Sequence, residues 1–349
     1  MILAIVGVGL IGGSLGLAAR RSGDFTVRGF SPRAGQAEKA GLIDEACESV
    51  EEAVDGADIV VVAVPAALCE QTVREVLAVA PPDCAVTDVG STKAGVVAAA
   101  GGDERYVGGH PLAGSEVSGF ENAREGLFDD ATWYLTPVET TSGVSLERVH
   151  RMVTSLSARP AIVEPAEHDR IMAAVSHLPH VFANLLVEQA ATALGDRTIP
   201  VAGPSFRDAT RVAGSTPELW ASIYRANAGA LGEAIDTAME RLAGVREALG
   251  QEDRDRLLGW QEQAGAERRR LAELGLEGGP VRELRVAVPN RPGVVAEIAL
   301  ALGRSDVNIV DMALSPAADR RSGVISLWVP EDQARAAEGC LAGIDLAPK

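Results

Sequence analysis

Short apolar runs alternate with helical spacings over the first half of the chain. Asp58–Val64 carries a continuous apolar run, as expected for a strand that is buried on both faces of a parallel sheet. Leu10–Arg20 has helical spacing directly after the first run. This alternation predicts an α/β domain of the doubly wound, Rossmann type, with helices on both faces of the sheet. Its other predicted strands are Ile2–Val6, Thr26–Phe30, Ala85–Asp88, Tyr106–Gly109 and Thr132–Thr136.

The pattern changes near Glu167. From there to about Leu276, alanine, leucine, glutamate and arginine recur with helical spacing and few prolines, which predicts an all-helical domain that could form a dimer core. After a break at Gly275–Pro280, short alternating runs predict a small βαββα module. The predicted domains are therefore 1–166, 167–279 and 280–349. In the module, strands are expected at Arg282–Val288, Val307–Asp311 and Gly323–Val329, with a last helix at Gln333–Ala342.

Charge and cysteine content narrow the classes of partner. The formal net charge is −17 at pH 7, and the sequence has no basic stripe of the kind a general nucleic-acid binder needs, so we expect no nucleic-acid partner. The four cysteines are not spaced as a metal knuckle or a redox pair, which is typical of reduced thiols in a cytoplasmic protein without a metal site. The longest apolar stretch, Ile59–Cys69, is too short to span a membrane, and no export signal precedes Gly7.

A glycine-rich loop follows the first predicted strand. Residues Gly7–Gly12 match G-x-G-x-x-G between a strand and a helix, the context in which this pattern binds a dinucleotide. Gly7 permits the tight turn, Gly9 lets the pyrophosphate approach the backbone, and Gly12 lets helix and strand pack closely. The free N–H groups of the following helix would face the phosphates. We expect further cofactor contacts from Leu10, Ile11, Val64 and Pro65.

The end of the second predicted strand informs the choice of cofactor. An NAD site usually has an acidic residue there for the ribose 2′-hydroxyl, but this chain has Ser31 and Arg33 and no acid. These two residues could accept a 2′-phosphate, which favours NADP or the use of both NAD and NADP. In the alternative interpretation, Arg33 is a solvated residue at the start of a helix.

Several later motifs supply a candidate substrate. In order and spacing, together with the glycine loop, they resemble the prephenate/arogenate dehydrogenase family of tyrosine biosynthesis over roughly residues 1–280. No single one of them would suffice. The motifs are Asp88–Lys93, Gly109–Glu116 with Ser118–Gly119, Ser176–His180, Asp208–Arg211 and Pro217–Trp220.

The resemblance implies an oxidative decarboxylation. Hydride leaves ring C4 of the substrate for the nicotinamide, the C4 hydroxyl loses a proton, and the C1 carboxylate departs as carbon dioxide. The resemblance assigns the role of proton acceptor to His110, and histidine suits it because its pKa lies near working pH. Ser91 is the expected second catalytic contact, although it could also be only the N-cap of a helix that begins at Thr92. Lys93 is expected to be a solvated helix residue.

The resemblance also points to residues that bind the substrate. Arg211 is the expected clamp for a carboxylate, oriented by Asp208, but an Asp–Arg pair within a helix explains the same spacing. His180 is expected to contact the substrate side chain, and His177 to be structural. With no nearby acid, the two histidines make a poor metal site. Ser115, Glu116 and Trp220 are expected in the pocket wall, and Trp220 could equally lie in a core or a dimer interface.

The tail resembles an ACT domain, a regulatory module that often binds amino acids. Asn290-Arg291-Pro292-Gly293 matches its ligand-loop turn, and Val307-Asn308-Ile309 matches its second strand. The resemblance therefore implies an effector site at Asn290–Gly293 and Asn308, with tyrosine as the natural ligand. A module used only for assembly is the alternative.

The sequence thus predicts a cytoplasmic, homodimeric NAD(P)-dependent prephenate dehydrogenase. Arogenate dehydrogenase, with the same mechanism and a different side-chain contact, is the nearest alternative. A β-hydroxyacid dehydrogenase would need a catalytic lysine in the helical domain, but residues 168–250 contain none. A non-catalytic amino-acid sensor on the same fold is disfavoured because His110, Ser91 and Arg211 occur together.

Overall fold

The structure is a computed structural model with two units, each described by itself. The first comprises Met1–Ala191 and Val212–Ala238, and the second Thr192–Arg211 and Met239–Lys349. The residues that the structure describes are 1–114, 119–195, 197, 203–274, 281–289, 294, 298, 301, 302, 305, 307, 309, 311–317, 322–344 and 346.

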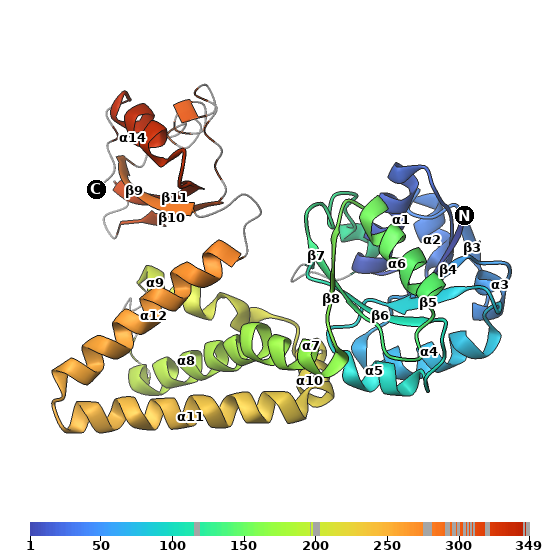
Figure 1. The fold of residues 1–349 in the computed structure, drawn as a ribbon, viewed down its shortest axis with the longest axis horizontal. Coiled ribbons are helices and arrows are strands. Elements are labelled where there is room, and N and C mark those ends of the chain that lie inside the picture. Colours follow the sequence, from blue (N-terminus) through green and yellow to red (C-terminus); the bar gives the residue numbers. More distant parts are fainter. Residues whose placement is uncertain are drawn as a thin grey trace. The chain divides into compact units, whose positions relative to one another are not determined.

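The first unit is built on a single eight-stranded sheet (Figure 1) with the order β3-β2-β1-β4-β5-β6-β7-β8. Its first six strands have the order of a dinucleotide-binding fold, and neighbours among them run parallel, which confirms the predicted α/β class. Strand β7 runs antiparallel to β6, so the sheet is mixed at that end. The strands are β1 Ile2–Val6, β2 Thr26–Phe30, β3 Glu45–Cys47, β4 Ile59–Val62, β5 Ala85–Asp88, β6 Tyr106–Pro111, β7 Thr132–Thr136 and β8 Arg159–Ile162.

The continuous apolar run in β4 is explained by helices on both faces of the sheet (Figure 1). Ile59 and Val61 face a core formed with α1 and α6, whereas Val60 and Val62 face a second core formed with α4 and α5. Both faces of a central strand must then be apolar, as the pattern predicts. The helices are α1 Leu10–Ser22, α2 Ala34–Lys39, α3 Val50–Val54, α4 Ala66–Val79, α5 Ala94–Ala99 and α6 Gly143–Ser155.

Two strands of this sheet were not predicted, and one predicted strand has different bounds. Strand β3 was not predicted because three residues are too few to show a period of two, and β8 because its second residue is proline, which argues against a strand. Strand β6 extends beyond Gly109 to Pro111, because it pairs with β7 as far as Pro111 and Trp133. His110 therefore lies within the last residues of a strand and not in a loop after it.

The helical segment that the sequence predicts from Glu167 is confirmed, since all described elements from there to Leu274 are helices. Helix α7 continues through one π-helical turn into α8, and such turns frequently occur at functional sites. By length and composition alone, the stretch Pro165–Leu194 could cross a membrane. The helices are α7 Pro165–Met172, the π-helix Ala173–His177, α8 Leu178–Leu194, α9 Pro204–Thr210, α10 Pro217–Ala226, α11 Ala228–Gly250 and α12 Arg254–Leu274.

The tail forms a three-stranded antiparallel sheet with the order β10-β11-β9. Its second strand begins at Asp311, so the prediction of a strand at Val307–Asp311 was wrong in position. The reason is local: the Val307 N–H donates to Leu302 O at 3.1 Å and closes the preceding helical turn. The elements are β9 Val281–Pro289, β10 Asp311–Pro316, β11 Ser322–Pro330 and α14 Ala334–Ala342.

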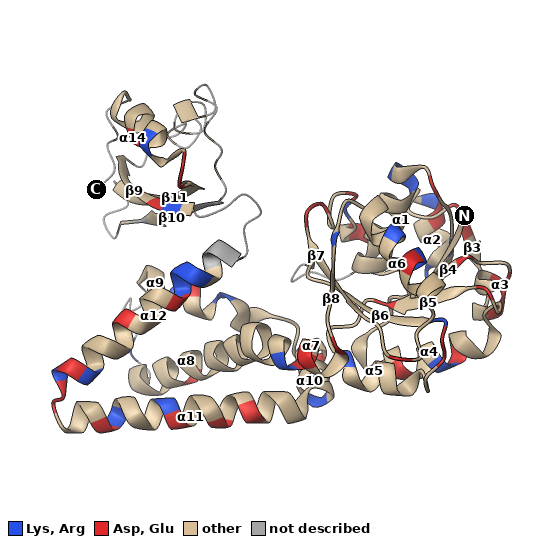
Figure 2. Ribbon diagram, in the orientation of Figure 1, with Lys and Arg blue, Asp and Glu red and all other residues tan. Residues whose placement is uncertain are grey.

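Charged side chains are interspersed along the long helices α11 and α12. Figure 2 shows both acidic and basic residues along these two helices. Several of them pair within the helices or across the turn between them, among them Arg256 with Glu247 and Arg270 with Glu267. These exposed pairs contribute little to stability, about 0–1 kcal/mol each, and are typical of solvated surfaces.

Candidate active site

The glycine loop has the geometry that a dinucleotide requires. Gly7 has φ 105°, and a Cβ there would lie 2.5 Å from Ala63 O. A Cβ at Gly12 would lie 2.0 Å from Gly7 O, so only glycine allows helix and strand to approach this closely. A Cβ at Gly9, in contrast, would meet no atom within 4 Å. The loop is therefore closed toward the protein and open at Gly9, where a phosphate would approach.

Helix α1 begins directly at this loop. Gly9 is its N-cap, without a side-chain cap or an acid in the first turn, so its first N–H groups and positive dipole end are available to an anion. Leu10 is buried and Ile11 half-buried at this end of the helix. Val64 and Pro65 lie between β4 and α4 beside Gly7, as the closeness of Val64 N to the Gly7 position indicates.

Arg33 is the exposed N-cap residue of α2, as the alternative interpretation expected, and both it and Ser31 have surroundings that bear on the cofactor. The Ser31 hydroxyl is buried and makes no hydrogen bond within the part of the chain that the structure describes, so a ribose hydroxyl could satisfy it. Arg33 pairs with Glu121 and lies over the Phe120 ring, with 4.7 Å from Cζ to the centroid. Arg33 is thus held by its neighbours, and part of its charge is compensated by a carboxylate.

Asp88, at the end of β5, forms a buried ion pair with Lys93, and both side chains are 0% exposed. The carboxylate also accepts hydrogen bonds from the Tyr106 hydroxyl at 2.7 Å and from the N–H groups of Gly90 at 2.8 Å and Gly109 at 3.0 Å. Burial, with the Asp88 charge second, raises the pKa of Tyr106 well above its ordinary value. The expectation that Lys93 is solvated was wrong.

Lys93 also connects this ion pair to the predicted base. Its ammonium group donates to Gly109 O at 2.7 Å, immediately before His110 in β6. The Lys93 ammonium group and the Asp88 carboxylate therefore both bind the backbone of Gly109, and they fix the residue that precedes His110.

His110 is the first of three residues joined by hydrogen bonds. Its Nδ1 lies 2.9 Å from His168 Nε2, and His168 Nδ1 lies 2.9 Å from Asp169 Oδ1. His168 and Asp169 come from α7, which is held against the sheet by the same carboxylate. Asp169 accepts from Lys93 N at 2.7 Å and from Ala94 N at 2.9 Å, the first amides of α5.

The surroundings of His110 and Asp169 determine whether each side chain is charged. Burial, followed by the charge of Lys93, holds the pKa of His110 well below its ordinary value, so at neutral pH the ring is uncharged and can accept a proton. Burial works against ionisation of Asp169, but the hydrogen bonds from His168 and from the two amides outweigh it and lower the pKa of Asp169. A neutral histidine at the carboxyl edge of the sheet is thus linked to an ionised carboxylate.

Ser91 lies in the loop between β5 and α5, half-buried. Helix α5 begins at Ala94 and not at Thr92, and the side chain of Asp169, not Ser91, accepts its first N–H groups. The alternative of Ser91 as a helix cap was therefore wrong. Among the described residues, no hydrogen bond joins Ser91 to His110, so its catalytic role stays a prediction.

Trp220 brings the other two predicted histidines together. The His180 ring stacks on it with centroids 3.3 Å apart, and His177 meets it edge-on at 6.0 Å. His177 is buried, and its Nδ1 lies 3.0 Å from Asn227 Nδ2, which also donates to Asp169 O at 2.8 Å. Burial lowers the pKa of His177 to about 4.

The remaining predicted site residues lie in the second unit or outside the described residues. Asp208 is exposed within α9, and Arg211 follows at its C-cap, both in the second unit. Their position at the substrate stays a prediction. Ser115, Glu116, Asn290, Arg291, Pro292, Gly293 and Asn308 lie outside the described residues.

Sequence reasoning missed His168, Asp169 and Asn227. The adjacent His168-Asp169 pair at the start of a predicted helix was a usable signal, because a histidine next to an acid can be oriented by it. It stood at the predicted domain boundary, and its partner His110 is 58 residues away in sequence.

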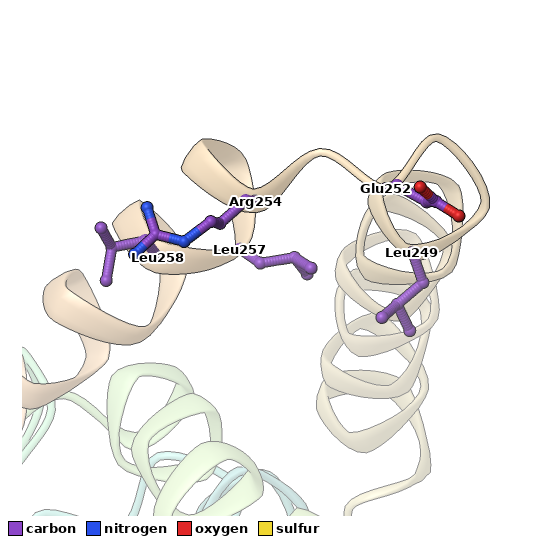
Figure 3. Close-up of a pocket in the computed structure, with 5 residues that line it drawn as sticks. All are labelled: Leu249, Glu252, Arg254, Leu257 and Leu258. Carbon is purple, nitrogen blue, oxygen red and sulfur yellow. The ribbon is translucent and has the colours of Figure 1, made fainter.

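A hollow of about 520 Å³ lies at the turn between α11 and α12 (Figure 3). Three leucines line it with Glu252 and Arg254. It contains no histidine or other neutral base, so it has no chemistry in common with the His110 site. No group of three or more His, Cys, Asp or Glu side chains that could hold a metal occurs in the described parts of the chain.

Two family models match the chain. The description "Prephenate dehydrogenase, nucleotide-binding domain" fits residues 15–162, and "Prephenate dehydrogenase, dimerization domain" fits residues 164–263. A prephenate dehydrogenase of Bacillus subtilis is 30% identical, with 97% of this chain and 95% of that protein covered. The chain belongs to the prephenate dehydrogenase family. The predicted family, fold class and dehydrogenase function are confirmed.

Two solved structures resemble this member of the family. A prephenate dehydrogenase of Aquifex aeolicus in complex with hydroxyphenyl propionate and NAD+ has a TM-score of 0.69 at 29% identity, covering 78% of this chain and 98% of that one. An arogenate dehydrogenase of Synechocystis has a TM-score of 0.70 at 28% identity, covering 78% of this chain and 100% of that one. The apolar stretch Pro165–Leu194 lies within the segment that the dimerization-domain model matches.

Proposed function

We propose that this dehydrogenase oxidises and decarboxylates prephenate to 4-hydroxyphenylpyruvate with NAD+. One observation carries the proposal: a histidine with a lowered pKa, His110, lies at the carboxyl edge of a dinucleotide-binding sheet and has one ring nitrogen engaged by His168. Its other nitrogen can accept the proton of the substrate hydroxyl. The nicotinamide, when bound, accepts the hydride from ring C4.

The other predicted residues would hold the substrate. Arg211, oriented by Asp208, would bind a carboxylate with two parallel hydrogen bonds. The stack of His180 on Trp220 fixes a ring nitrogen for the substrate side chain. Ser91 would contact the substrate hydroxyl, while Ser115 and Glu116 would complete the pocket wall.

NAD+ is proposed over NADP+. The support is the Aquifex aeolicus complex with NAD+ and, in this chain, the carboxylate of Glu121 beside Arg33, which opposes the approach of a 2′-phosphate. The loop Gly7–Gly12 would hold the pyrophosphate, and Ser31 the adenosine ribose. Replacing Glu121 by Gln leaves Arg33 uncompensated, so kcat/KM with NADP+ should rise relative to NAD+. An unchanged ratio would remove Glu121 from cofactor selection.

Prephenate is proposed over arogenate because the Bacillus subtilis relative, which matches nearly the whole chain including the tail, is a prephenate dehydrogenase. Formation of NADH or NADPH by purified protein should be measured with prephenate and with arogenate, each with NAD+ and with NADP+. Turnover with prephenate and NAD+ is expected to be the fastest. Faster turnover of arogenate would select the alternative substrate, and turnover of neither would refute the proposal.

The assembly and the tail complete the proposal. The domains are proposed at 1–166, 167–279 and 280–349 in a cytoplasmic homodimer. Leu185, Leu186 and Val187 of α8 are more than 40% exposed and suit an apolar interface within the matched dimerization domain.

The ACT-like tail would bind tyrosine as a feedback effector. Calorimetric titration of the full chain with tyrosine tests this, and no heat of binding would favour an assembly role.

A further inference from the structure

The hydrogen-bonded series His110–His168–Asp169 does more than hold a histidine in place. We infer that His168 and Asp169 are positioning residues that hold His110 as the Nδ1–H tautomer and share the positive charge it acquires in turnover. The inference rests on the proposed function, in which His110 is the base. It follows from the donor and acceptor roles along the series.

The tautomers follow from Asp169. An ionised carboxylate can only accept hydrogen bonds, so His168 must donate to it from Nδ1–H at 2.9 Å. The Nε2 of a neutral His168 is then an acceptor. His110 must therefore donate from Nδ1–H across the 2.9 Å contact, and its Nε2 keeps the free lone pair. Only this arrangement presents a base to the substrate hydroxyl.

The carboxylate is placed to remain charged although it is almost fully buried. Asp169 is 4% exposed and His168 0%. Two α5 amides donate to the carboxylate, and the positive end of that helix favours negative charge there. The Tyr134 ring meets His168 edge-on at 5.4 Å and limits its rotation. Asp169 and His168 are thus fixed in one orientation before substrate binds.

The proton balance of the reaction gives the series a further role. The O–H bond of the C4 hydroxyl breaks and an N–H bond forms at His110 Nε2 as hydride leaves C4. Loss of carbon dioxide from C1 returns an electron pair to the ring and leaves a phenolate at C4. The phenolate takes the proton back from His110, so none is released overall. In between, the imidazolium is stabilised through His168 by the Asp169 charge.

The tautomer can be read directly because the chain has only five histidines. Two-bond proton–nitrogen correlation spectra of protein with nitrogen-15 histidine, compared with a His110→Gln sample to assign the signal, should show His110 protonated at Nδ1 near neutral pH. A His110 protonated at Nε2 would overturn the inference. This readout needs no activity, so it stays decisive even if neither prephenate nor arogenate is turned over.

Kinetics separate positioning from a merely structural role. His168→Phe keeps a ring of similar size without nitrogens, and should lower kcat by about 10²-fold or more, within the range for general-base catalysis. KM and NAD+ affinity should change less than about threefold, because no substrate or cofactor contact is removed. His168→Gln returns an oxygen acceptor for Nδ1–H and should recover about tenfold of the lost kcat.

The exposed His150 on α6 provides the matched control. His150→Phe and His150→Gln should leave kcat unchanged. Equal losses in both His168 variants, in proportion to lowered melting temperatures, would assign His168 a structural role and overturn the inference.

Discussion

Replacing Lys93 by Met should destabilise the protein by about 3 kcal/mol. Removing one partner of a buried ion pair costs about 3–5 kcal/mol because the other charge is left uncompensated. Asp88 is fully buried but keeps three other donors, Tyr106, Gly90 and Gly109, which places the cost at the lower end of that range. The methionine itself fits, since it matches the length of the lysine stem.

Urea unfolding at pH 7 measures this cost. Lys39→Met on the exposed end of α2 is the matched control and should change the free energy of unfolding by less than about 0.5 kcal/mol. The double variant Asp88→Asn/Lys93→Met removes both charges and should be more stable than Lys93→Met alone, so the two changes are not additive. If Lys93→Met matched the control, the pair would be solvated in solution and the argument for a fixed β5–β6 edge would fail.

Three further predictions concern single side chains. Gly9→Val should fold normally, because its Cβ has open space, but should weaken NAD+ binding at least tenfold by calorimetry; unchanged affinity would place the pyrophosphate elsewhere. Because the pKa of His177 is about 4 in the folded protein, below the ordinary 6.5, its contribution is fully present above pH 6.5 and is lost toward pH 4. Urea unfolding of the wild type should therefore show a loss of about 3 kcal/mol that His177→Gln lacks; parallel pH profiles would contradict this. Trp220→Ala removes the stack under His180 and should raise KM for prephenate about tenfold with a smaller effect on kcat; an unchanged KM would make Trp220 purely structural.

Sequence predicted what depends on neighbours along the chain. The turn at Gly7, the α/β class of the nucleotide-binding half and the helical segment after Glu167 follow from local spacing and period. His110 was identified because it stands in a motif. Sequence did not predict its partners, because the contact between His110 and His168 spans 58 residues and exists only once α7 packs on the sheet. Lys93 was misjudged for the same reason: a lysine at a helix start is usually solvated, and only the fold encloses it with Asp88.

The carboxylate of Asp169 connects parts of the chain that match different family models. It belongs to the segment matched from residue 164, yet it caps α5 in the segment that ends at residue 162. His110 lies in the first segment and its partner His168 in the second, so their contact forms only when α7 packs on the sheet. The proposed base and its positioning residues therefore come from both segments. In a chimera that joins the two segments from different relatives, the carboxylate at position 169 would still have to cap α5 and contact His168. A chimera without these contacts is expected to bind nucleotide but not to turn over substrate.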